Sequence, residues 1–196
     1  DHDHAIELQP DDAWIIANRG DTLYAMARYG DALAAYNRAI ELDADNATYR
    51  SDRGNVHRGT GRYEEALDDY TRATELDPDN AWHRMDRGIT LRLLGRAEER
   101  DELRRAVELY SAEIENSGGD LRTAHLRGNL VIVHCAAHAW EKASEELESF
   151  LGCAPGTRRI QEALKDLADL QKALGGELPE IRTLRLRLES VAAQGA

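Results

Sequence analysis

Residues 63–76 show a regular alternation of apolar and polar side chains. Tyr63, Ala66, Tyr70 and Ala73 follow one another at steps of three and four residues, with charged residues between them. This spacing places the four side chains on one stripe of an α-helix. A single pair of helices cannot bury such a stripe, so the pattern predicts helices that stack on neighbouring helices.

The same pattern recurs at a constant offset along the chain. Gly20, Gly54 and Gly88 are each separated by 34 residues, and each directly follows an arginine. At the same offset, the segment ELDADN at 41–46 matches ELDPDN at 75–80. The proline, aspartate and asparagine residues of these segments favour helix ends and helix starts. The constant offset therefore predicts a series of repeats, each built from two helices.

The repeat register divides the chain into six segments. We expect the end of a truncated N-terminal repeat at 1–12, regular repeats at 13–46 and 47–80, extended repeats at 81–120 and 121–157, and a divergent capping helix pair with a tail at 158–196. Because residue 1 falls in the middle of a second helix, we expect a fragment of a longer protein. Gly88 and Gly128 are 40 residues apart, and this excess predicts a bend or a phase shift, with Ser117-Gly118-Gly119 as a candidate flexible turn.

The second helices also share a pair of residues four positions apart. Alanine is followed by tyrosine at Ala32/Tyr36, Ala66/Tyr70 and Ala106/Tyr110. With the 34-residue period and the constant spacing of Gly20, Gly54 and Gly88, the chain resembles the tetratricopeptide repeat family. The resemblance implies an all-α, right-handed α-solenoid of antiparallel helix-turn-helix repeats.

The chain departs from the family pattern in its first helices. Arginine occupies the position where the family has leucine, at Arg19, Arg53, Arg87 and Arg127. We expect these arginines to lay their aliphatic stems over the core and to reach an acid on a neighbouring helix.

The resemblance also implies a function. First helices in this family line a concave groove that binds peptides, so we expect a protein–protein interaction module, a scaffold, adaptor or sensor segment, and not an enzyme. The groove positions of the family correspond here to Trp14, Asp21, Tyr24, Ser51, Asn55, Arg58, Trp82, Met85, Ile89, Arg92, His125 and Asn129. We expect the tryptophans, tyrosine, methionine and arginines to be exposed, because such residues form binding hot spots.

The chemistry of the bound peptide is constrained by which residues are present. The family's best-known groove clamps the C-terminal carboxylates of chaperones with a lysine–asparagine pair in its first repeat, where this chain has Ala17 and Asp21. A clamp of that kind is not expected. Arg58 and Arg92 instead favour an acidic or phosphorylated peptide stretch.

Two other functions compete with peptide binding. Self-association could proceed through the ends of the solenoid, with apolar residues of the terminal helix such as Leu184. A metal site could involve His134 and His138, which are four residues apart and are expected to share one helix face, next to Cys135. The tract Asp1-His2-Asp3-His4 also resembles a metal-binding sequence, but the repeat register accounts for it, because His2 falls at the position of Tyr36.

Charge and composition exclude several classes of protein. The formal net charge is −12, and residues 1–80 alone carry 18 acids and 8 bases. Nucleic acid phosphates would be repelled, so no nucleic acid partner is expected. No apolar run is long enough for a membrane span. The two cysteines, Cys135 and Cys153, favour a reduced, cytoplasmic protein, and the resemblance suggests one of bacterial type. The sequence has no phosphate loop or nucleophile elbow, and we expect no cofactor.

Overall fold

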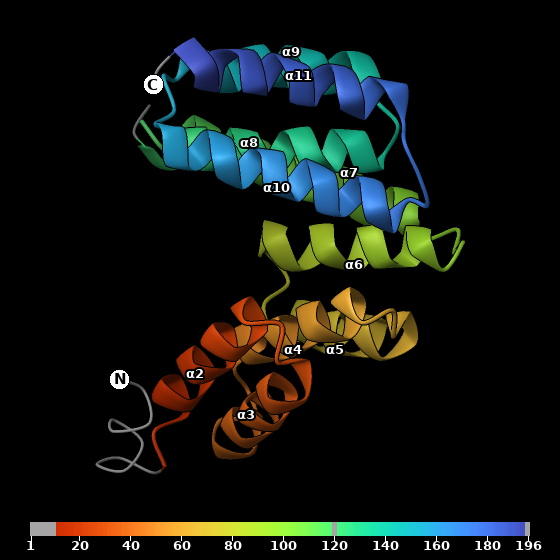
Figure 1. Cartoon of the computed structure of the whole chain (residues 1–196). Coiled ribbons are helices and arrows are strands. Elements are labelled where there is room, and N and C mark those ends of the chain that lie inside the picture. The colour runs from red at the N-terminus through yellow and green to blue at the C-terminus, as the bar shows by residue number, and fades with distance from the viewer. Residues whose placement is uncertain (1–10, 119–120, 195–196) are drawn as a thin grey trace. The chain divides into compact units, whose positions relative to one another are not determined.

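The computed structural model of the chain describes residues 11–118 and 121–194. Within these ranges the chain forms ten α-helices and no strand, which confirms the all-α fold (Figure 1). The helices are α2 (Ala13–Ala25), α3 (Tyr29–Leu42), α4 (Ala47–Gly59), α5 (Tyr63–Leu76), α6 (Ala81–Leu93), α7 (Glu99–Asn116), α8 (Leu121–Ala136), α9 (Trp140–Gly152), α10 (Thr157–Ala173) and α11 (Pro179–Gln194). None of them has the length and apolar character needed to cross a membrane.

Some sequence-based expectations fall outside the described ranges. These are the truncated repeat over most of 1–12, the Asp1-His2-Asp3-His4 tract, and the Gly119 end of the candidate flexible turn. The repeat boundaries themselves stay predictions.

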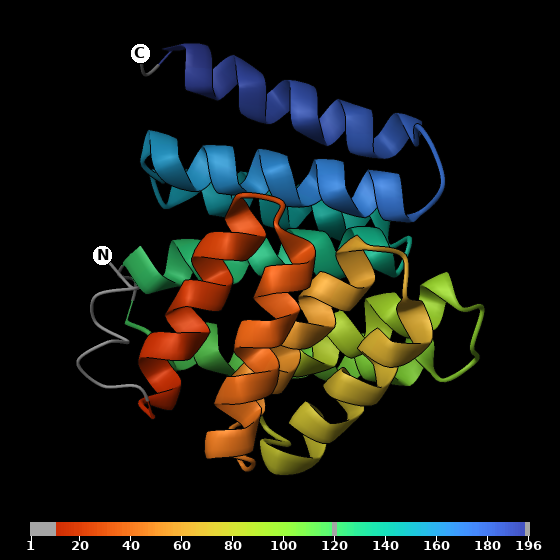
Figure 2. The ribbon, with the colours of Figure 1, turned by 60° about the horizontal axis from the view of Figure 1, so that its bottom comes forward.

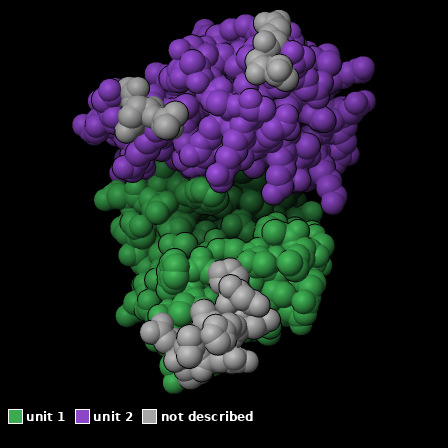
Figure 3. Space-filling model, turned by 60° about the vertical axis from the view of Figure 1, so that its left-hand side comes forward, with its two compact units in different colours: residues 1–95 green, residues 96–196 purple. Residues whose placement is uncertain are grey.

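The chain divides into two compact units, residues 1–95 and 96–196 (Figure 3). The division falls inside the segment 81–120 that we expected to form one extended repeat. Helix α6 therefore belongs to unit 1, and α7 belongs to unit 2.

In unit 1, α2 packs against α3 and α4 packs against α5, while α4 also contacts α3 and α6 contacts α5. The two helix pairs can be followed in red to ochre in Figure 2. Short turns join the members of each pair, so the helices are antiparallel. The second helix of each pair buries its alanines and its tyrosine, with Ala32, Tyr36, Ala66 and Tyr70 at most 2% exposed.

Three side chains define where the first helices of unit 1 begin. Asp12, Asn46 and Asn80 precede α2, α4 and α6, and each accepts a hydrogen bond from a backbone N–H of the first turn at 3.0–3.1 Å. Such caps satisfy backbone donors that the helix leaves without a partner. They place Trp14 and Trp82 as the second residue of their helices.

The first and second helices approach closely at a glycine. A Cβ atom on Gly20 would lie 2.8 Å from the ring of Tyr36, and one on Gly54 would lie 2.9 Å from the ring of Tyr70. Both distances are shorter than carbon atoms tolerate without movement. The absence of a side chain at these glycines is what allows each tyrosine ring to pack against the first helix.

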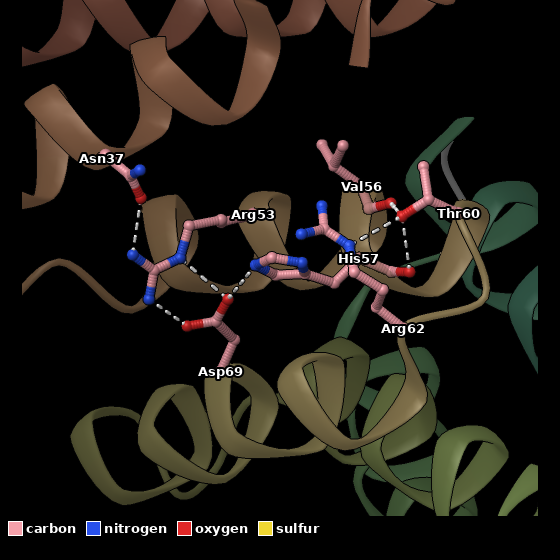
Figure 4. A network of polar contacts seen from close by, with 7 residues as sticks. All are labelled: Asn37, Arg53, Val56, His57, Thr60, Arg62 and Asp69. Atoms are coloured by element: carbon pink, nitrogen blue, oxygen red, sulfur yellow. Dashed lines mark hydrogen bonds and ion pairs between the residues drawn. The ribbon is translucent and has the colours of Figure 1, made fainter. Parts of the chain in front are cut away.

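An ion pair in unit 1 confirms the expected role of the arginine at the leucine position. Arg53 donates from Nε to the Asp69 carboxylate at 2.9 Å, from a terminal nitrogen to the same carboxylate at 2.5 Å, and from its other terminal nitrogen to Asn37 Oδ1 at 2.8 Å (Figure 4). Asp69 is 3% exposed. Arg53 thus ties α4 to both α5 and α3. In unit 2, Arg127 pairs in the same way with Glu146 at 2.6 Å.

A histidine lies beside this ion pair. His57 Nε2 is 3.8 Å from an oxygen of Asp69. Burial lowers the pKa of His57, and the nearby Arg62 lowers it further, although Asp69 acts in the opposite direction. The imidazole is therefore neutral at pH 7, and Arg53 is the cation that balances Asp69.

In unit 2, α8 packs against α9 and α10 packs against α11, while α7 and α10 both contact α8. The core is formed by apolar residues from every helix of the unit: Leu103, Val133, Leu147, Phe150, Leu167, Ile181 and Leu188, all 2% exposed or less. Gly128 again faces an aromatic ring, but that ring belongs to Phe150, and a Cβ at Gly128 would lie 3.7 Å from it.

We predict that replacing Ala27 by glycine stabilises the protein. Ala27 has a φ of 58°, in the left-handed region that alanine disfavours, whereas the matching positions Gly61 and Gly95 are glycines with φ of 78° and 66°. Ala27→Gly should raise the free energy of unfolding by about 1 kcal/mol, and Gly61→Ala should lower it by a similar amount. Urea denaturation measures both, and a destabilised Ala27→Gly variant would contradict the argument.

We also predict that Arg53 and Asp69 are strongly coupled. Arg53→Leu leaves a buried carboxylate without its cation and should cost about 3–5 kcal/mol of unfolding free energy. Adding Asp69→Ala removes that carboxylate, so the double variant should regain most of the loss. Equal stabilities of the single and double variants, measured by urea denaturation, would show that the ion pair has no such role.

Candidate functional site

Six side chains of the first helices gather into one group in unit 1. We call them the unit 1 site: Asp21 from α2, Asp52, Asn55 and Arg58 from α4, and Trp82 and Asp86 from α6. Four of the six, Asp21, Asn55, Arg58 and Trp82, are among the groove residues expected from the sequence. Asp52 and Asp86 are not, although both precede the repeat glycine by two residues and so recur at the 34-residue offset.

Tyrosine hydroxyls orient two members of the site. Tyr36 donates its hydroxyl hydrogen to Asp21 Oδ1 at 2.6 Å, and Tyr70 donates to Asn55 Oδ1 at 2.8 Å. Each tyrosine is the one whose ring packs on the glycine that directly precedes Asp21 or Asn55. The close helix approach therefore delivers a hydrogen-bond donor to the side chain of the next residue. Burial, and the bond to Asp21, raise the pKa of Tyr36, so this hydroxyl keeps its hydrogen.

Arg58 is held within the site by three contacts. One terminal nitrogen donates to Asp86 Oδ1 at 2.6 Å, and the other donates to Asn55 Oδ1 at 3.2 Å. The guanidinium also lies over the ring of Tyr70, 5.5 Å from its centre. Burial disfavours the charge of Arg58, but the Asp86 carboxylate outweighs burial and the pKa of Arg58 is raised. The Arg58 charge is thus permanent and is compensated by Asp86, which is 2% exposed.

Trp82 is an exposed aromatic residue with a fixed orientation. Its indole ring donates from Nε1 to Asp86 Oδ2 at 2.5 Å, while 44% of the residue remains exposed. Trp14 is 67% exposed. Both tryptophans therefore have the exposure expected from the sequence.

Asp52 differs from its neighbours in the site. Among the described residues it makes no hydrogen bond or ion pair, whereas Asp21 and Asp86 each have a donor. Burial raises the pKa of Asp52 to about 7, and the nearby carboxylates of Asp21 and Asp86 contribute to the increase. The ionised form of Asp52 is thus costly in the folded protein.

Several expected groove residues are not exposed. Ser51, Met85 and Ile89 are 3%, 7% and 5% exposed, so the expectation of an exposed methionine is wrong. Ser51 and Met85 lie three residues before a repeat glycine, and Ala17 at the same position of α2 is also buried. The side chain at this repeat position therefore points into the packed interior, and the residue types alone do not predict this burial. Of the remaining expected residues, Tyr24 and Arg92 are half-buried.

The expected groove residues of α8 belong to unit 2 and lie within a different set of contacts. The Asn129 amide nitrogen is 3.5 Å from His125 Nε2, and Arg159 of α10 is 3.5 Å from His125 Nδ1. Arg159 also pairs with Glu162 at 2.7 Å. Burial, followed by the charge of Arg159, lowers the pKa of His125, which is neutral at pH 7.

The premise of the metal-site hypothesis is wrong. Helix α8 ends at Ala136, so His134 and His138 do not share a helix face. His138 lies in the turn with a left-handed φ of 55° and stacks on Trp140 at 4.9 Å, whereas His134 is 9% exposed. The residues that the structure describes contain no group of three or more histidine, cysteine, aspartate or glutamate side chains able to hold a metal.

Comparison with known proteins gives one family. The tetratricopeptide repeat model matches residues 18–81 and 51–121, which together cover just over half of the chain. No curated protein matches the chain.

Solved structures of tetratricopeptide repeat proteins are similar to it. YrrB, described as a TPR protein with an unusual peptide-binding site, is 20% identical over 98% of this chain and 96% of its own, with a TM-score of 0.51, and this shows the shared helical-repeat solenoid fold. The second TPR of Spaghetti (RPAP3), bound to the HSP90 peptide SRMEEVD, is 27% identical over 52% of this chain and 95% of its own, with a TM-score of 0.49. MamA is 18% identical over 78% of this chain and 84% of its own, also with a TM-score of 0.49.

We predict that Asp52→Asn stabilises the protein in a pH-dependent way. Because the pKa of Asp52 is raised on folding, the unfolded chain loses this proton at lower pH than the folded protein does. The cost of Asp52 therefore appears as the pH rises above about 4 and is complete above about 7. Allowing for solvent screening, we expect Asp52→Asn to raise the free energy of unfolding by about 1–2 kcal/mol at pH 8 and to leave it unchanged at pH 4. Urea denaturation at both pH values measures this difference. An equal gain at both would contradict the pKa assignment.

Proposed function

The chain belongs to the tetratricopeptide repeat family, and from this premise we propose that it is a protein-interaction module whose unit 1 site binds a peptide segment of a partner protein. The first helices that carry this site are the ones on which the sequence predicted peptide binding. Family membership favours a binding role over a catalytic one. A cytoplasmic location remains a prediction from the sequence.

The observation that carries the proposal is the exposed, fixed indole ring of Trp82. Large exposed aromatic side chains with few conformations lose little entropy when they bind, and tryptophan is enriched in interface hot spots. The hydrogen bond to Asp86 holds the ring of Trp82 before any partner arrives. Preorganisation of this kind adds affinity, because the cost of ordering the side chain is met during folding.

Polar groups next to Trp82 add the potential for specificity. Asp21 and Asn55 accept hydrogen bonds from tyrosines of α3 and α5, and Arg58 donates to Asn55 and to Asp86 of α6. All three residues are only partly buried or exposed. A site with one aromatic anchor and several fixed polar groups is suited to an extended peptide, which presents backbone amides and alternate side chains.

Self-association through the helical ends stays a prediction, but the residue chosen to test it must change. Leu184 is 4% exposed and packs in unit 2, so its replacement would destabilise the unit rather than probe a surface. Leu186 on the same helix is 56% exposed. Leu186 is therefore the residue whose substitution reports on self-association.

We predict that Trp82→Ala weakens peptide binding. Peptides selected from a random display library on the wild-type protein should bind the Trp82→Ala variant about 30-fold more weakly, the equivalent of about 2 kcal/mol for a hot-spot residue. Fluorescence polarisation of the labelled peptides measures the affinity, and Leu186→Ala is the control, because it removes an exposed apolar side chain from unit 2. Selected peptides that bind both variants as tightly as the wild type would place the binding surface elsewhere.

A further inference from the structure

The ion pair between Arg58 and Asp86 changes the chemistry that we expect of the partner. From the sequence, Arg58 favours an acidic peptide. In the structure its guanidinium already pairs with Asp86 at 2.6 Å and donates to Asn55 at 3.2 Å. An incoming carboxylate would have to compete with a nearly buried one that is already in place. Arg58 is therefore a structural element of the site and contributes little positive potential outside it.

The carboxylates of the site are compensated unequally. Asp86 accepts from Arg58 and Trp82, and Asp21 accepts from Tyr36. Asp52 has no donor among the described residues, and the other two carboxylates are close enough to disfavour its ionised form. A half-buried anion beside two other anions costs folding free energy unless a cation approaches it.

We propose that the peptide bound by the unit 1 site presents a lysine or arginine side chain to Asp52. This inference rests on the proposed peptide-binding function and specifies the charge of the bound segment. The cation forms an ion pair with Asp52 and screens it from Asp21 and Asp86. The unfavourable free energy of ionised Asp52 in the unbound protein is then offset when the peptide binds.

Two further features fit a basic peptide. Trp82 is hydrogen-bonded to Asp86, so an exposed aromatic ring belongs to the same group of side chains as Asp52, and the face of an indole ring attracts guanidinium and ammonium groups. In addition, residues 1–80 carry a net charge of −10. A field of this sign accelerates the approach of a basic segment and slows that of an acidic one.

Alternative occupants fit the site less well. A phosphorylated or acidic peptide would meet Asp21 and Asp52 and would find Arg58 already paired. A metal ion requires a group of ligands, and the described residues offer no cluster of three suitable side chains. The charge and the aromatic surface together therefore favour a basic peptide.

To test the inference, peptides are selected from a random display library for binding to the full chain. Their affinities for the Asp52→Asn and Asp68→Asn variants are then compared with that for the wild type. Asp68 is an exposed acid of α5 outside the site, so both variants change the net charge equally. We expect selected peptides to be enriched in lysine and arginine. Their affinity should fall about tenfold in Asp52→Asn and less than about twofold in Asp68→Asn, because only Asp52 contacts the cation. Circular dichroism and urea denaturation confirm that each variant is folded.

A second readout reports on Asp52 directly. Burial and the neighbouring carboxylates raise the pKa of its carboxyl group to about 7 in the free protein, and this pKa, measured by ¹³C NMR, should fall when a selected basic peptide is bound. The same peptide with its lysines and arginines replaced by glutamine should bind more weakly and leave this pKa unchanged.

The outcomes separate this inference from the proposed function. Peptides that require Trp82 but show no lysine or arginine enrichment, or that bind Asp52→Asn and the wild type equally, overturn the basic-peptide inference and leave peptide binding intact. If no selected peptide depends on Trp82, the proposed site is wrong and the inference falls with it. Three results together support both the proposed function and the basic-peptide inference. The selected peptides are enriched in lysine and arginine, their affinity falls in Asp52→Asn, and their affinity is retained in Asp68→Asn.

Discussion

The contact between a glycine of the first helix and a tyrosine of the second is the constraint on which unit 1 depends. At Gly20 and Gly54 there is no room for a Cβ atom, and the ring that fills this space carries a hydroxyl group. That hydroxyl reaches the next residue of the first helix, Asp21 or Asn55. In unit 2 the ring opposite Gly128 belongs to phenylalanine and has no such donor. A Cβ atom at Gly128 would lie 3.7 Å from that ring, an ordinary contact distance, so the close approach is found at Gly20 and Gly54 of unit 1, where it also orients polar side chains of the unit 1 site.

The same arrangement explains why the site has one costly member. Hydrogen bonds and an ion pair satisfy Asn55, Arg58 and Asp86, so these residues stabilise the fold as well as shape the surface. Asp52 gains nothing comparable, and burial raises its pKa to about 7, so its ionised form costs the fold stability. Residues that reduce stability without a structural role are concentrated at functional sites, where the cost is accepted for binding or catalysis.

Much of the fold could be predicted from the sequence because its signals are local. The 34-residue offset and the alanine–tyrosine pairs follow from which residues share a helix face, and the expectation that Arg53 reaches an acid on a neighbouring helix is confirmed by its pairing with Asp69. The errors arose where a neighbouring helix decides the outcome. Periodicity did not show that Met85 is buried, or that α8 ends before His138. The pairing of Arg58 with Asp86 also depends on how α4 and α6 meet, and a single sequence contains no measure of that.

The ion pair between Arg53 and Asp69 has an evolutionary consequence. The family's usual residue at position 53 is leucine, and a lineage that returned to it one substitution at a time would pass through a protein with a buried, unbalanced charge. Two substitutions that are each harmful alone but tolerated together are separated by a fitness valley, which genetic drift crosses slowly. Arg53 also holds Asn37, so a third helix is involved in the exchange. We therefore expect relatives of this chain to keep or lose Arg53 and Asp69 together, as a correlated pair within otherwise variable repeats.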